Sequence, residues 1–80
     1  MHIKILLFGV TRDIVGNSIL DIRISDGQNV GEMMEELKSR FPELNKLNSL
    51  LVAVNSEYAD EDKILTQSDE IALIPPVSGG

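Results

Sequence analysis

The residues best placed to do chemistry are the last two of the chain, Gly79 and Gly80, and they offer it without side chains. Glycine adopts backbone conformations closed to other residues, and it lets a second surface approach the backbone closely. A Gly-Gly end can therefore enter a narrow channel and present its α-carboxylate there. A frayed end or a remnant of cloning would also read as two glycines, because chain termini are often disordered.

The residues before the two glycines favour a functional tail. Pro75 and Pro76 fix φ and donate no backbone hydrogen bond, so strand pairing should end there. An extended, polyproline-like stretch then projects the following residues away from the domain. We therefore expect residues 75–80 to form an extended arm suited to insertion into another protein.

No other set of residues supports catalysis by the chain alone. The sequence has no cysteine and a single histidine, His2, which is typical of a surface position near a strand edge. It lacks a Ser/His/Asp set, a metal-binding histidine pair and a glycine-rich phosphate loop. The acidic side chains at positions 57 and 60–62 do not have calcium-loop spacing, which leaves solvated surface or recognition by a partner. We expect no permanently bound cofactor and no metal.

Length and charge restrict the class of protein further. Eighty residues with 42% hydrophobic content predict one small domain, 1–80, of modest stability. The net charge of −6 argues against a nucleic-acid partner and suits steering towards a basic protein, although many acidic soluble proteins share it. No apolar run approaches the roughly 18 residues of a membrane span, and no signal-peptide cleavage site follows Met1. With no cysteines, the chain fits the reducing cytoplasm.

The hydrophobic pattern predicts an α+β fold. Strands are expected at residues 2–8, 18–24, 50–54 and 70–74, with room for a short edge strand at 58–59. A helix should begin near Val30, after the capping pair Asn29 and Glu32, and end at Pro42. Residues 9–16 are expected to be a connection, and residues 43–49 a connection or a short helical turn. This order fits a ubiquitin-like β-grasp roll, a mixed sheet covered on one face by one main helix, with its first and last strands adjacent in the middle.

The alternation within the first and last strands predicts which face is covered. The core should contain Ile3, Ile5, Leu7, Ile71 and Leu73. Leu6, Phe8 and Ile74 would then lie on the uncovered face, close to the tail. Exposed apolar patches commonly mark a partner surface, although a loop folded over these side chains is the alternative.

Over essentially its whole length, the chain resembles the small subunits of molybdopterin synthase, a family of ubiquitin-like sulfur carriers. A bare Gly-Gly end is shared by ubiquitin-like modifiers and the thiamine-pathway carrier, whereas Pro-Pro-Val-x-Gly-Gly is far more specific to this family. The resemblance is carried by residues 5–8, 12–13, 15–16, 50–55, 65, 69–71 and, above all, the ending Pro-Pro-Val-Ser-Gly-Gly at 75–80.

The resemblance implies a mechanism in which the chain is one half of an enzyme. A separate activating enzyme uses ATP to adenylate the Gly80 carboxylate, and sulfur then replaces an oxygen to give a thiocarboxylate. The tail enters the large synthase subunit, where the sulfur attacks the cyclic pterin precursor of the molybdenum cofactor. Such activation must come from another protein, since a carboxylate is a poor nucleophile and a poor acyl group.

The resemblance also implies roles for individual residues. Gly80 would bear the sulfur, and Gly79 would let it pass the channel. The family assembles as a heterotetramer with two large subunits at its centre. The contacts with the large subunit would be made by Phe8, Tyr58, Ile74, Pro75, Pro76 and Val77.

Three other interpretations share parts of this pattern. A ubiquitin-like protein modifier would use the same fold, tail and adenylation step, but would join Gly80 to lysines of other proteins. A sulfur carrier for another product, such as thiamine, would share the Gly-Gly end, although the proline pair argues against it. A non-covalent interaction domain would use neither glycine.

Overall fold

The computed structural model of the chain describes residues 1–47 and 49–75. In this part of the chain, five strands form one sheet in the order β2-β1-β5-β3-β4. β1 and β5 are parallel neighbours and the other pairs are antiparallel, so the sheet is mixed, as expected. The strands are β1 (His2–Leu7), β2 (Ile19–Arg23), β3 (Leu51–Val54), β4 (Glu57–Tyr58) and β5 (Glu70–Ile74). The helices are α1 (Val10–Val15), α2 (Val30–Arg40) and the 3-10 helix η1 (Pro42–Lys46).

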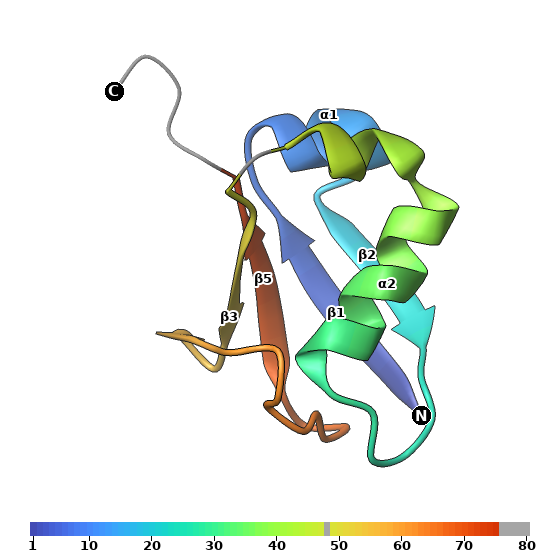
Figure 1. The fold of residues 1–80 in the computed structure, drawn as a ribbon, viewed down its shortest axis with the longest axis vertical. Helices are drawn as coiled ribbons and strands as arrows, with labels where there is room; N and C mark the ends of the chain where they lie inside the picture. Colours follow the sequence, from blue (N-terminus) through green and yellow to red (C-terminus); the bar gives the residue numbers. More distant parts are fainter. Residues whose placement is uncertain (48, 76–80) are drawn as a thin grey trace.

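The core lies between α2 and one face of the sheet (Figure 1). All five side chains predicted for this face of β1 and β5 are at most 2% exposed. Val30, Met33 and Leu37 of α2 are equally buried. Full burial of one such side chain contributes about 1.5–3 kcal/mol, so this contact is the main source of stability.

α2 begins and ends as its sequence predicts. The Asn29 side chain accepts a hydrogen bond from Glu32 N at 2.8 Å, and the Glu32 side chain accepts one from Asn29 N at 3.0 Å. The helix ends at Arg40, because Phe41 precedes Pro42 and a residue before proline is disfavoured in the α conformation. η1 follows directly and supplies the short helical turn.

The connection expected at residues 9–16 contains a short helix, α1, which the sequence pattern did not predict. Six residues make fewer than two turns, so no helical periodicity is visible in the sequence. Gly16 ends the helix in the left-handed conformation, at φ 90°, and donates its N–H to Arg12 O. α1 lies beside the end of β1 that leads into it (Figure 1).

The ends of the strands also differ slightly from the sequence pattern. β1 ends at Leu7, so Phe8 lies just beyond it, and β4 is the pair Glu57–Tyr58.

Across the described residues, no helix is both long and apolar enough to cross a membrane. The same residues contain no group of three or more His, Cys, Asp or Glu side chains that could hold a metal ion.

Candidate functional site

The sheet face opposite α2 is hollowed at the end where β1 and β5 finish. The hollow, here called the open-face pocket, has a volume of about 330 Å³. Its floor includes Ala53 and Ala72, which are paired neighbours on β3 and β5 and leave room between larger side chains. The pocket is lined by Leu6, Phe8, Ala53, Ser56, Tyr58, Glu70, Ala72 and Ile74.

The structure brings together three residues that the sequence and the resemblance singled out, Phe8, Tyr58 and Ile74. Phe8 is 50% exposed and Tyr58 70% exposed, while Ile74 is half-buried. Their common face follows from register, because Ala53 pairs with Tyr58 on one side and with Ala72 on the other. No loop among the described residues buries Phe8 or Tyr58, so these two side chains are open to a partner.

The sequence reasoning missed Leu51 on this face. Leu51 pairs with Ile74 across β3 and β5, and is exposed. The signal was available in the sequence of β3, because Leu51 lies two residues before Ala53 and so shares its face, opposite the face of Val52 and Val54. The apolar part of the open face therefore extends beyond the residues first identified.

The start of the tail lies beside Phe8. β5 ends at Ile74, directly before Pro75, which confirms that strand pairing stops there. Because β1 and β5 run parallel, with Leu7 opposite Leu73, the C-terminal ends of both strands lie at the same end of the sheet. The predicted site residues Pro76, Val77, Gly79 and Gly80 lie outside the described residues.

A glycine is required at the corner between β1 and α1. Gly9 has φ 54° and ψ −131°, a backbone conformation that L side chains rarely adopt. A Cβ at this position would lie 3.2 Å from Cγ of Pro75. The corner after Phe8 therefore packs closely against the first residue of the tail.

The turn of the β3–β4 hairpin, which carries Tyr58, is tied to the start of β5 by Asn55, in addition to the pairing of β3 with β5. Asn55 and Ser56 both have positive φ, 53° and 70°, as the tight turn of a type I′ hairpin needs. Asn55 N donates to Glu70 O at 2.8 Å, and the Asn55 side chain accepts from Glu70 N at 2.9 Å. Its amide nitrogen donates to Oδ1 of Asp69 at 2.9 Å. The sequence pattern gave no indication of these contacts between Asn55 and the start of β5.

Hydrogen bonds stabilise the ionised form of Asp69. Thr66 N donates to Oδ2 of Asp69 at 2.8 Å, and this bond is the largest cause of a pKa held below the ordinary value of 3.8. The Asn55 amide acts in the same direction, while partial burial opposes both. The ionised Asp69 carboxylate, directly before β5, thus links the Asn55 side chain of the hairpin turn to the backbone of Thr66.

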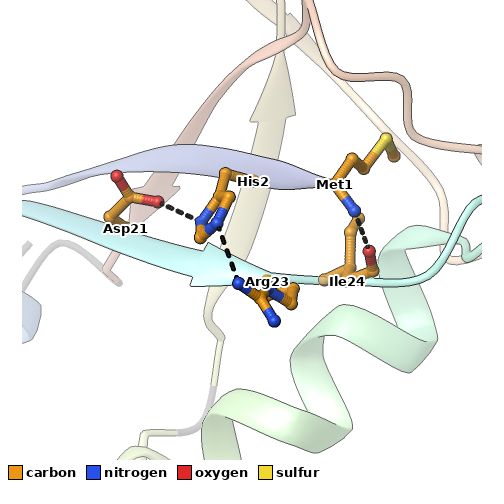
Figure 2. A network of polar contacts seen from close by, with 5 residues as sticks. All are labelled: Met1, His2, Asp21, Arg23 and Ile24. Atoms are coloured by element: carbon orange, nitrogen blue, oxygen red, sulfur yellow. Dashed lines mark hydrogen bonds and ion pairs between the residues drawn. The ribbon is translucent and has the colours of Figure 1, made fainter.

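The remaining polar candidates lie away from the pocket or are exposed. His2 is exposed, as expected, and lies at the opposite end of β1 from Phe8. Its Nδ1 is 3.3 Å from Asp21, and its Nε2 is 3.4 Å from Nη2 of Arg23 (Figure 2). A neutral imidazole protonated on Nδ1 satisfies both contacts, so the geometry is that of a surface network. The predicted acidic stretch is also exposed, with its first residue, Glu57, in β4.

Comparison with known proteins identifies the family. The model of the ThiS family matches residues 5–80. This chain belongs to the ThiS family. The expected membership among ubiquitin-like sulfur carriers is confirmed, and so is the β-grasp fold.

The chain is similar over most of its length to curated relatives of similar length. It is 37% identical to the molybdopterin synthase sulfur carrier subunit of Arabidopsis thaliana, covering 100% of this chain and 84% of that protein. It is 38% identical to the subunit of the same name from Dictyostelium discoideum, covering 96% and 94%. Among solved structures, SAMP1 of Haloferax volcanii superposes with a TM-score of 0.85 at 25% identity, over 100% of both chains.

Proposed function

We propose that the chain is the small subunit of a molybdopterin synthase, in which Gly80 carries sulfur as a thiocarboxylate. One observation carries the proposal: the parallel ends of β1 and β5 set an open apolar pocket beside Pro75, where a Gly-Gly-terminated tail begins. Relatives that are 37% and 38% identical and bear the sulfur-carrier name support it. In this proposal residues 1–80 are one domain, with the tail at 75–80.

The chemistry requires the tail to be activated by a second protein. A carboxylate oxygen of Gly80 attacks ATP in the activating enzyme, giving an acyl-adenylate and pyrophosphate. Sulfur at the oxidation level of sulfide then attacks the acyl carbon, the acyl–phosphate bond breaks and AMP leaves, which gives the thiocarboxylate. The thiocarboxylate sulfur then forms a bond to a carbon of the cyclic pterin precursor. Water cleaves the acyl–sulfur bond, so the sulfur stays on the pterin and Gly80 returns to the free acid. ATP belongs to the activating enzyme, and the carrier itself holds no permanent cofactor.

The large subunit supplies the remainder of the active site. Phe8, Tyr58 and Ile74 would dock on its surface, while Gly79 lets the terminus through a channel. Pro75, Pro76 and Val77 would line the entry to that channel. We further propose a heterotetramer with two large subunits at its centre, working in the cytoplasm, where the chain's lack of cysteine suits a reducing environment.

Truncation of the tail tests the proposal directly. A chain lacking Gly80, or one with Gly79→Val, should fold normally but lose pterin conversion in a reaction reconstituted with the large subunit and activating enzyme. Ser78→Ala is the matched control, since it alters the tail without adding a β-branch next to the reacting group. Normal turnover by the chain lacking Gly80 would contradict the proposal.

A protein-modifier function is the second candidate, favoured by the close superposition on SAMP1, which is named a small archaeal modifier protein. The two functions share adenylation of Gly80 and differ in the acceptor. A modifier would be recovered from cells with Gly80 in isopeptide linkage to lysines. A sulfur carrier would be recovered as free acid or thiocarboxylate.

A further inference from the structure

Among the described residues, Thr11 is the one polar residue that is buried, and it lies in the first turn of α1. Its hydroxyl accepts a hydrogen bond from Phe8 N at 3.0 Å and donates one to Phe8 O at 2.6 Å. Phe8 O also accepts from Thr11 N at 3.2 Å. A single hydroxyl therefore pairs both backbone groups of Phe8.

The backbone of Phe8 depends on this hydroxyl, because β1 ends one residue earlier. The last ladder bond on the β2 side runs from Leu7 N to Ser18 O. Phe8 follows Leu7 and precedes Gly9, at which the chain turns into α1. The two hydrogen bonds between the Phe8 backbone and the Thr11 hydroxyl are partly buried. Without the hydroxyl, Phe8 N would lose this partner, whereas Phe8 O would keep its bond from Thr11 N. An unpaired N–H in a partly buried place is costly, which favours the Phe8 backbone conformation that keeps the bond to Thr11.

The direction of the Phe8 side chain follows from its fixed backbone. Thr11 is fully buried, whereas the Phe8 side chain is half exposed and lines the open-face pocket. Gly9, between them, turns the chain and packs against Pro75. The buried Thr11 hydroxyl thus holds the backbone of Phe8, whose side chain is exposed beside the start of the tail.

We propose that Thr11 is a positioning residue that presents Phe8 to the large subunit in its binding conformation. Holding an anchor in its bound geometry raises affinity because less conformational freedom is lost on binding. Thr11 itself makes no contact with the partner. The inference rests on the proposed function, since it presumes that Phe8 docks on the large subunit.

The test compares Thr11→Val with Thr11→Ser in calorimetric titrations of the full chain against the large subunit. Valine keeps the shape and removes the hydroxyl, so affinity should fall about fivefold to tenfold, as expected for a lost hydrogen-bonding group. Serine keeps the hydroxyl and should restore most of the affinity. Ser39→Ala removes a hydroxyl at an exposed position of α2 outside the pocket and should leave affinity unchanged.

Two further readouts separate positioning from a general loss of stability. Amide exchange in Thr11→Val should speed up at Phe8 while Ile5, in the middle of β1, stays protected. In a Phe8→Ala background, Thr11→Val should cause little further loss of affinity, because the group through which it acts is absent.

The outcomes distinguish this inference from the proposed function. Binding by the wild-type chain, with losses from Thr11→Val and Phe8→Ala that simply add, would overturn the positioning role alone. Unchanged affinity in Thr11→Val would do the same. Failure of the wild-type chain to bind the large subunit at all would overturn the proposed function, and this inference with it.

Discussion

At the scale of single residues, the open face combines large exposed anchors with small residues that make room between them. Phe8 and Tyr58 are at least half exposed, and Ala53 and Ala72 form the floor beside them. Aromatic side chains in this arrangement are suited to insertion into a partner surface, where a few such anchors carry most of the binding free energy. The energetic role of Phe8 is therefore expected in the complex more than in the free domain.

Phe8→Ala should weaken binding of the large subunit by about 1–4 kcal/mol. The free energy of unfolding should change less, because half of the Phe8 side chain is already in water. Titration calorimetry and urea unfolding of the same samples measure the two effects. Ile64→Ala is the control, since Ile64 is also about half exposed, at 51%, but does not line the pocket. A larger effect on unfolding than on binding would contradict this prediction.

The hydrogen bonds to Asp69 predict how stability depends on pH. The pKa of Asp69 in the folded chain lies below its ordinary value of 3.8. Its stabilising contribution is therefore complete above about that value and is lost as pH falls through the lower folded pKa. Urea unfolding should show Asp69→Asn to be less stable than wild type at neutral pH. The gap should narrow below pH 3.8, and a gap independent of pH would exclude this role.

At the scale of elements, the sequence predicts the strands and helices that are specified by residues close together in the chain. The alternation in β1 and β5 predicted the buried face, and Asn29 with Glu32 predicted where α2 begins. α1 was missed because six residues show no periodicity. The bonds of Asn55 to Asp69 and Glu70 span 14 and 15 residues, so no local pattern reveals them. The same holds for the contact of Gly9 with Pro75.

The type I′ turn between β3 and β4 makes a prediction about stability. Ser56 has φ 70°, a conformation costly for residues with a Cβ, and the favoured sequence for this turn is Asn-Gly. Ser56→Gly should therefore raise the free energy of unfolding by up to about 1 kcal/mol. Ser39→Gly makes the same change inside α2 and should lower it by about 0.5–1 kcal/mol. Thermal unfolding that shows the same sign for both would contradict the turn assignment.

At the scale of the whole molecule, the two ends of the sheet differ in character. One end carries the open-face pocket and the start of the tail, and the other carries the polar network of His2, Asp21 and Arg23 (Figure 2). With a net charge of −6, the chain is suited to steering towards a basic partner surface. In the proposed function, the domain therefore presents its C-terminal tail, which begins at Pro75, to other proteins.

The mass of the C-terminal peptide tests the central claim most directly. The chain has no cysteine, so sulfur carried covalently for transfer should be on the terminal carboxyl group. Incubation with the activating enzyme, ATP and a sulfur source should exchange one oxygen for sulfur, and fragmentation should place the exchange at Gly80. Addition of the large subunit and the cyclic pterin precursor should return the mass to that of the free acid. A terminus that stays unmodified, or that forms only isopeptide bonds to lysines, would contradict the sulfur-carrier account.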